Sequence, residues 1–114
     1  MRSLNQHGGG DPARVAPDFH AAIELIGRRW AGAILWALRE RPHYFAELTT
    51  SVPGLSDRLL SRRLRELEAA GLVERSVSAG PPARVSYALT EKGRALEPAL
   101  GELAAWARDW KLSS

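Results

Sequence analysis

Apolar residues recur with helical spacing along most of this chain, and turn-forming residues divide the pattern into segments. The clearest amphipathic segment is 53–72, in which leucines recur at i, i+4 and i+7 and therefore share one face of a helix. Pro53 and Gly54 break the chain before this helix, because proline fixes φ and glycine permits a turn. Ser56 stands at the N-cap position, and Gly71 is expected to close the helix. The leucines on the inward face are Leu60, Leu64 and Leu67.

Four further helices and two strands are predicted around this segment. Asp18 is expected to cap the first helix and Thr90 the last. Apolar residues alternate strictly in the second strand, and a turn-rich loop joins it to the first. A short helix, a tight turn, a longer helix and a hairpin, in that order, predict an α+β, mainly α fold of the winged helix-turn-helix type. The predicted helices span about 18–27, 29–40, 44–51 and 91–111, and the strands span 72–77 and 84–89.

The chain is long enough for one domain with one modest core, at 114 residues. Residues 1–16 lack periodicity and contain three consecutive glycines, so we expect a flexible N-terminal arm. Residues 17–112 form the predicted winged helix-turn-helix domain for DNA binding and dimerisation. Its N- and C-terminal helices are expected to flank the domain as dimerisation helices.

The last predicted helix carries an apolar stripe with the 4-3-4-3 spacing of a coiled-coil seam. Pro98 removes an amide donor within it and is expected to kink the helix. So short a chain has little core left to cover the stripe, which predicts a homodimer. The alternative is that the stripe only packs on the chain's own core. Its members are Leu96, Leu100, Leu103, Ala107 and Trp110, with Trp106 beside them.

The distribution of charge along the chain indicates a binding partner, whereas the net charge of +3 is too small to do so by itself. Four arginines fall between positions 58 and 65, which favours a large anion such as double-stranded DNA; the alternative is an ordinary solvated face. We expect Arg58, Ser61 and Arg62 to face base edges, and the other candidates to position the DNA backbone. Those others are Arg63, Arg65, Arg75 and Arg84, with His43 or Tyr44 and the cap residue Ser56.

Aromatic residues on the expected dimer elements are weaker candidates for a small-molecule effector site. They are Phe19, His20, Trp30, Trp36, Trp106 and Trp110. A cleft among them would suit a planar apolar ligand, and burial in the core is the alternative for each tryptophan.

Several functional classes find no support in the residues. The three histidines lie on unrelated segments without metal-ligand spacing, so we predict no enzyme, no catalytic residues, no metal and no cofactor. The chain has no cysteine, which excludes disulfides and thiol chemistry within these residues. No apolar run is long enough to span a membrane and no signal core is present, so a cytoplasmic protein without a membrane partner is expected.

Several motifs in one order resemble the HxlR-type winged-helix transcriptional regulators, bacterial relatives of the MarR group. The likeness covers about residues 17–106. It implies a dimeric DNA-binding regulator, which we expect to be a repressor acting on a pseudo-palindromic operator. The alternative is a winged helix used for protein–protein contact without specific DNA binding. The matching segments are 22–30, 45–48, 53–56, 60–61, 64–75, 84–87 and 89–94.

The resemblance also makes the missing cysteine informative. In many members of that family a cysteine before the first helix senses oxidants or electrophiles. The matching position here is about Pro17, so thiol sensing is excluded and a small aromatic ligand, or no effector, remains.

Overall fold

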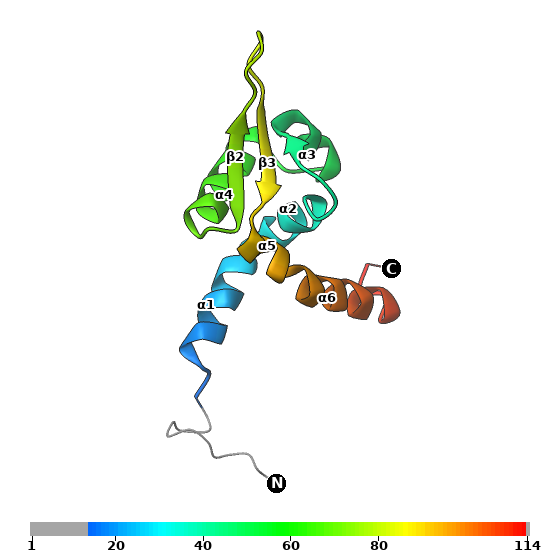
Figure 1. Cartoon of the computed structure of the whole chain (residues 1–114). Coiled ribbons are helices and arrows are strands. Elements are labelled where there is room, and N and C mark those ends of the chain that lie inside the picture. Colours follow the sequence, from blue (N-terminus) through cyan, green and yellow to red (C-terminus); the bar gives the residue numbers. More distant parts are fainter. Residues whose placement is uncertain (1–13, 114) are drawn as a thin grey trace.

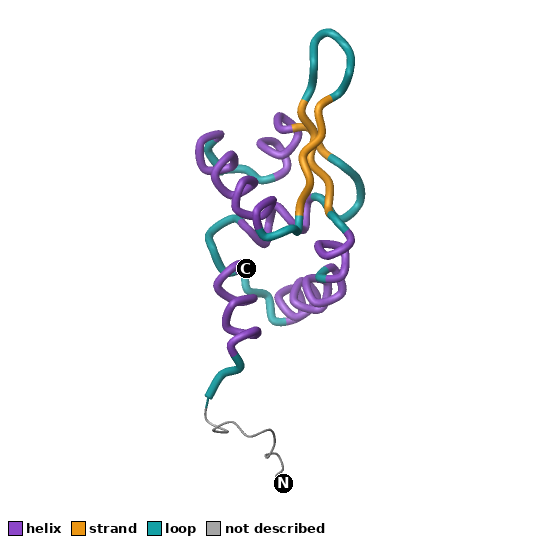
Figure 2. The backbone as a smooth tube through the Cα atoms, turned by 60° about the vertical axis from the view of Figure 1, so that its left-hand side comes forward, coloured by secondary structure: helices purple, strands orange, loops and turns teal. Residues whose placement is uncertain are grey.

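The structure is a computed structural model that describes residues 14–113, so most of the expected N-terminal arm lies outside the described residues. A β-hairpin projects from one end of a helical body, and the first and last long helices leave the body at the other end (Figure 1). A second direction of view shows the same arrangement (Figure 2). The elements are α1 (Pro17–Ile26), α2 (Ala31–Ala37), β1 (His43–Tyr44), α3 (Phe45–Ser51), α4 (Asp57–Ala69), β2 (Val73–Val77), β3 (Val85–Leu89), α5 (Glu91–Ala95) and α6 (Glu97–Asp109).

The core lies between α2, α3, α4 and the inner face of the hairpin. The three leucines predicted to share the inward face of α4 are all fully buried in it, which confirms that pattern. They meet aliphatic side chains from α2 and α3, so burial of one continuous apolar cluster holds the helix-turn-helix together. Its largest fully buried members are Ile34, Leu35, Leu38, Leu48, Leu60, Leu64, Leu67 and Val73.

The hairpin belongs to a three-stranded antiparallel sheet in the order β1-β3-β2. Val73 pairs with Leu89 and Val77 with Val85, close to the predicted strands. Tyr87 and Leu89 are buried and Val85 is half-buried, as the alternation predicted. The strand β1 was missed because it has two residues and no periodicity of its own. It exists through its pairing with β3, in which Tyr44 lies opposite Ser86.

The first two helices differ from their predicted bounds. Ala16, not Asp18, is the N-cap of α1, because Pro17 can occupy the first helical turn without a donor. The second helix begins only at Ala31, since Trp30 adopts a left-handed conformation with φ of 78°. Residues 27–30 therefore form a turn, which includes positions 29 and 30 where the sequence predicted the start of the second helix.

The predicted last helix is divided in two at Leu96. Thr90 caps α5 as expected, its hydroxyl accepting from the Gly93 amide at 3.1 Å. Gly93 packs so closely on the preceding segment that a Cβ there would collide with the Leu72 carbonyl oxygen. Pro98 lies in the first turn of α6, where its missing amide costs no hydrogen bond. The break between α5 and α6 therefore takes the place of the kink that was predicted within one helix.

Across residues 14–113, no helix combines the length and apolar character needed to cross a membrane.

Candidate DNA-binding surface

The helix α4 is fixed at both ends by local contacts. The Ser56 hydroxyl accepts a hydrogen bond from the Leu59 amide at 3.1 Å, which confirms the predicted cap. Gly54 and Gly71 have φ of 90° and 80°, conformations that favour glycine. Ser56 thus has a defined structural role at the start of α4.

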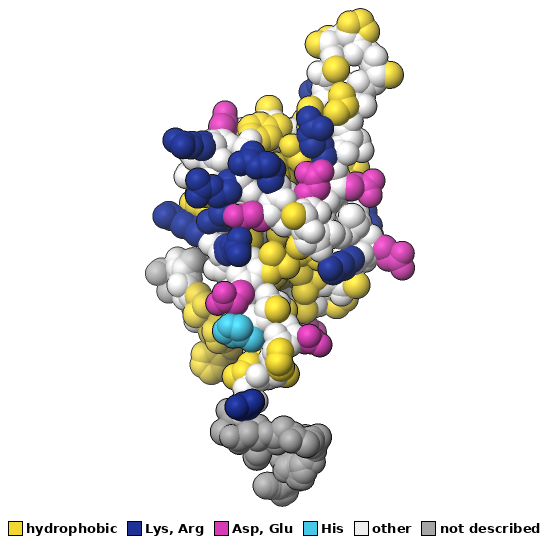
Figure 3. Space-filling view, turned by 90° about the vertical axis from the view of Figure 1, so that its left-hand side faces the viewer, with side chains coloured by type: hydrophobic (Ala, Val, Ile, Leu, Met, Phe, Trp, Pro, Cys, Tyr) yellow, Lys and Arg dark blue, Asp and Glu magenta, His cyan; other side chains and the backbone are white. Residues whose placement is uncertain are grey.

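The outward face of α4 carries the predicted basic patch. Arg58, Arg62 and Arg65 are exposed, and Ser61 beside them is half-buried. Within residues 14–113 these three guanidinium groups form no ion pair, side-chain hydrogen bond or ring contact. The space-filling view shows Lys and Arg side chains gathered over the side of the molecule that carries α4 (Figure 3). The face therefore presents positive charge that no described acidic residue neutralises.

Arg63 is arranged differently from these three neighbours. Its Nε donates to the Arg29 carbonyl oxygen at 2.8 Å, and its Nη1 contacts Glu66 Oε1 at 3.1 Å. Glu66 also pairs with Arg28 at 3.1 Å. The Arg63 side chain is only 15% exposed. These contacts tie α4 to the turn between α1 and α2, so the structure gives Arg63 an internal role rather than a place on the outward face.

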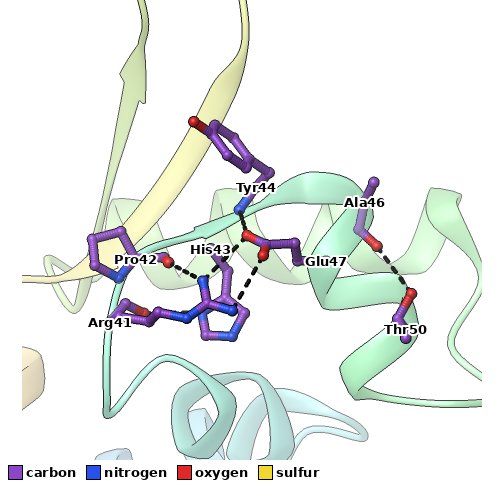
Figure 4. Close-up of polar contacts among 7 residues, drawn as sticks. All are labelled: Arg41, Pro42, His43, Tyr44, Ala46, Glu47 and Thr50. Atoms are coloured by element: carbon purple, nitrogen blue, oxygen red, sulfur yellow. Dashed lines mark hydrogen bonds and ion pairs between the residues drawn. The ribbon is translucent and has the colours of Figure 1, made fainter.

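The segment before α3 holds a second polar cluster (Figure 4). Glu47 accepts from the Tyr44 amide at 2.8 Å and pairs with Arg41 at 3.1 Å. These two contacts, the amide hydrogen bond first, hold the pKa of Glu47 below its ordinary value. His43 is 7% exposed, and its Nδ1 lies 2.9 Å from the Arg41 carbonyl oxygen. The prediction that His43 contacts DNA is therefore wrong, because its side chain is buried beneath the surface.

Arg84 and Tyr44, both predicted to contact DNA, meet each other. The Cζ atom of Arg84 lies 3.7 Å from the centroid of the Tyr44 ring. Arg84 is exposed just before β3, and its guanidinium has no acidic partner among the described residues. Arg75, on the outer strand β2, is also exposed and likewise unpaired within that part of the chain.

The structure is a helix-turn-helix with arginines on its second helix, followed by a hairpin wing that consists of β2, β3 and the loop between them. This arrangement matches a known family. The family model described as HxlR-like helix-turn-helix matches residues 25–114. The chain belongs to the HxlR family. It is therefore a transcriptional regulator of the HxlR and MarR-like type, with a DNA-binding helix-turn-helix and a winged-helix fold, as the sequence predicted.

Individual relatives agree with this assignment. The HxlR-family chain is 41% identical to the HTH-type transcriptional regulator YvaP of Bacillus subtilis strain 168, over 86% of this chain and 91% of YvaP. The structure of the reduced form of the transcriptional regulator YodB from B. subtilis superposes with a TM-score of 0.75 at 41% identity, covering 82% and 92% of the two chains. The structure of the redox regulator HypR in its reduced form superposes with a TM-score of 0.77 at 34% identity. The match covers 81% of this chain and 91% of the HypR chain. These relatives are regulators of transcription rather than enzymes.

The six aromatic residues predicted for an effector do not meet in one site of this HxlR-family chain. Trp30 packs its ring against Gly54 in the turn before α4. Trp36 lines a shallow groove of about 180 Å³ between α2 and α6, together with Gly32 and Leu100. The other four predicted residues are exposed on α1, on α6 or just after it: Phe19, His20, Trp106 and Trp110.

A larger groove, of about 550 Å³, lies between α1 and α5 and was not predicted. Leu25, Leu72 and Leu96 contribute to its mostly apolar lining. None of the six predicted aromatic residues lines this groove. Sequence reasoning missed it because its walls come from segments far apart in the chain.

Within residues 14–113, no group of three or more His, Asp or Glu side chains is arranged to hold a metal.

The apolar stripe of the last predicted helix is divided between two environments in this HxlR-family chain. Leu96 and Leu100 pack against the core, whereas Leu103 and Trp110 are exposed. The view that the stripe only packs on the chain's own core is thus wrong for its C-terminal half. Further large apolar side chains are exposed on or after α6, namely Trp106 and Leu112, and on or before α1, namely Val15, Phe19 and Ile23.

Proposed function

We propose that this HxlR-family protein is a homodimeric repressor in the cytoplasm that binds a pseudo-palindromic operator through α4. The observation that carries the proposal is the outward face of α4, on which Arg58, Arg62 and Arg65 have no acidic partner within residues 14–113. Arginines whose donors are not used inside the protein are available to guanine edges and to phosphates.

Each candidate residue has a defined role in this proposal. Arg58, Ser61 and Arg62 read base edges in the major groove, because they lie together on the exposed side of α4. Arg65, Arg75 and Arg84 contact phosphates and set the register of the protein on DNA. The remaining candidates act indirectly: Ser56 caps α4, Arg63 anchors it, His43 is buried beneath the surface, and the Tyr44 ring contacts Arg84.

The dimer part of the proposal rests on exposed apolar surface. Phe19 and Ile23 on α1, Leu103 and Trp106 on α6, and Trp110 just after α6 are all exposed in the single chain. Exposed apolar side chains gathered on two helices are typical of an interface between subunits. A two-fold axis would place the two copies of α4 in major grooves about one helical turn of DNA, ~10 bp, or a multiple apart.

An effector, if the regulator has one, is proposed to be a planar aromatic molecule that enters beside Trp36 in the groove between α2 and α6. One solved structure of the relative YodB is described as quinone-bound, which is a ligand of that class. YodB and HypR have been solved in forms named for their redox state. These 114 residues contain no cysteine, so thiol redox chemistry has no residue on which to act.

Selection of bound sequences from a random DNA pool tests the proposal. The expected result is a pseudo-palindrome with half-sites about one helical turn apart. Binding of random duplex DNA should also weaken as salt rises, because each phosphate contact releases counterions. A protein that shows no salt-dependent binding would instead be a protein-contact module. Enrichment of a single half-site without symmetry would contradict the dimer.

Titration with candidate aromatics tests the effector separately. Tryptophan fluorescence and operator affinity should change at the same ligand concentration, because the ligand would shift the spacing of the two copies of α4. Trp36→Phe should remove the fluorescence change attributed to this groove. Compounds that leave both signals unchanged are not effectors.

A further inference from the structure

We propose that Tyr44 is a positioning residue for Arg84: its ring holds the guanidinium flat where the loop of the wing meets β3, so that the pair acts as one phosphate-binding unit. The inference rests on the proposed DNA-binding function and refines it. Tyr44 then acts through its ring face and not as a separate contact through its hydroxyl. The unit joins two parts of the DNA-binding surface, the wing and the start of α3.

The contact geometry supports a stacked pair. The Cζ atom of Arg84 lies over the Tyr44 ring, 3.7 Å from its centroid. So short a distance is typical of a guanidinium parallel to the ring, because an edge-on approach keeps Cζ farther away. A stacked guanidinium retains all of its in-plane N–H donors, which match two oxygens of one phosphate. Stacking and phosphate binding are therefore compatible.

Both members of the pair are held by their backbones. Tyr44 pairs with β3 opposite Ser86, and its amide donates to Glu47 at the start of α3. The Tyr44 ring points away from the Arg41–Glu47 cluster (Figure 4). The Arg84 carbonyl accepts from the Ser78 amide at 2.8 Å, and the Arg84 amide donates to the Ser78 hydroxyl at 2.9 Å. A side chain fixed in this way loses less conformational entropy on binding.

The Arg84 guanidinium has no acidic partner within the described part of the chain. Arg84 differs in this respect from Arg39, which also stacks on an aromatic ring. Arg39 lies 4.0 Å over the Trp36 ring, but it also donates to the Trp36 carbonyl at 2.7 Å and contacts Glu40 at 3.6 Å. Arg84 has no such carbonyl or carboxylate partner for its guanidinium within residues 14–113. Its donors are consequently available to an external anion.

The distribution of charge along the wing predicts that this anion binds beside the tip loop rather than on it. The tip, residues 79–83, has no charged residue, so Arg84 is the cation that stands next to it in sequence. The positive charge of the wing is therefore carried by Arg84 and by Arg75 on β2. DNA phosphate is the anion that fits, because the same chain offers further unpaired arginines on α4.

A double-mutant cycle tests the inference, with affinity for a random-sequence duplex measured across a salt series. Arg84→Ala should weaken binding and reduce the magnitude of the salt slope by about one. Tyr44→Leu should weaken binding by about five-fold, whereas Tyr44→Phe should bind like the wild type, because phenylalanine keeps the ring. In the Arg84→Ala background, Tyr44→Leu should have no further effect. Non-additivity of this kind is the signature of two residues acting as one unit.

Arg75 supplies the matched control, since it is a wing arginine with no ring against it. Tyr44→Leu should retain its full five-fold effect in an Arg75→Ala background. An equal effect in the Arg84→Ala and Arg75→Ala backgrounds would overturn the inference, because it would show that Tyr44 supports α3 generally. Loss of binding by Tyr44→Phe would overturn it in favour of a hydroxyl contact.

DNA binding by the wild-type protein, measured across the same salt series, distinguishes failure of this inference from failure of the proposed function. Absence of salt-dependent DNA binding by the wild type would overturn both. Wild-type binding that Arg84→Ala leaves unchanged would overturn this inference and the phosphate contact of Arg84, while DNA binding through α4 would stand.

Discussion

Arg63 on α4 donates a hydrogen bond from Nε to the backbone carbonyl of Arg29 at 2.8 Å, although 34 positions separate the two residues. Glu66, one turn along α4, contacts both Arg63 and Arg28 at 3.1 Å. Trp30, in the same turn, lies against Gly54. The turn between α1 and α2 is thus attached both to α4 and to the residues that precede it. The direction of α4 relative to α1 is set by these contacts.

Replacing Arg63 should lower stability rather than remove a DNA contact. We expect Arg63→Ala to reduce the free energy of unfolding by about 1–3 kcal/mol, because the Arg29 carbonyl and Glu66 lose a largely buried charged partner. Chemical denaturation measures this. The matched control is Arg65→Ala on the exposed face, which should change stability by less than about 0.5 kcal/mol. Similar losses in the two variants would contradict the anchoring role of Arg63.

The exposed arginines of α4 should divide into base-reading and phosphate-binding residues. We expect Arg62→Ala to cost about 1–3 kcal/mol on the selected operator and much less on random DNA. Arg65→Ala should weaken binding to both by the same factor and reduce the magnitude of the salt slope by about one. Titrations of both duplexes at several salt concentrations measure these effects. An equal loss for Arg62→Ala on both duplexes would make it a phosphate contact.

The dimer surface can be tested with two side chains of nearly equal exposure. Leu103 on α6 and Val77 on β2 are 54% and 53% exposed. Leu103→Glu should shift the protein toward the monomer in sedimentation velocity, because a charge would be buried at the proposed interface. Val77→Glu should leave the oligomeric state unchanged. Dissociation caused by the Val77 variant, or none by the Leu103 variant, would place the interface elsewhere.

Gly93 should be far less tolerant of substitution than Gly80. A Cβ at Gly93 would collide with the Leu72 carbonyl, whereas nothing lies within 4 Å of a Cβ at Gly80. We expect Gly93→Ala to lower the free energy of unfolding by about 1–3 kcal/mol, since overpacking forces the backbone to shift. Gly80→Ala should have little effect. Thermal unfolding of the two variants provides the comparison.

The Glu47 cluster should contribute stability that depends on pH. The pKa of Glu47 is lower in the folded protein than its ordinary value of 4.5, because the Tyr44 amide and Arg41 stabilise the carboxylate. The unfolded chain therefore binds the proton more readily. The contribution is fully present above the ordinary pKa and is lost as pH falls through the folded one.

Glu47→Gln provides the measurement for this contribution. The difference in unfolding free energy between wild type and Glu47→Gln should be constant near pH 7 and shrink below about pH 4.5. A difference that does not change over this interval would show that the carboxylate's charge has no part in holding the start of α3.

Local pattern was enough to predict much of the fold. The leucine face of α4, the caps at Ser56 and Thr90 and the alternation in β3 all depend on residues within one or two turns of each other. Short stretches of sequence determine these features, because helix period, cap chemistry and strand alternation are local properties. The basic face of α4 follows from the same period, since the leucines determine which side faces outward.

Tertiary structure decided what depends on distant neighbours. The strand β1 exists only beside β3, and the predicted last helix breaks at Leu96, after the α5 turn in which Gly93 packs on Leu72. The sequence showed Arg63 and Arg65 as similar residues, but a carbonyl from another segment holds one and not the other. Arg84 likewise acquires its position from the Tyr44 ring. Sequence by itself determined the type of regulator and the face that carries its charge. Only the folded chain decided which arginines present their donors, because a guanidinium is satisfied by whatever acceptor the fold brings within reach.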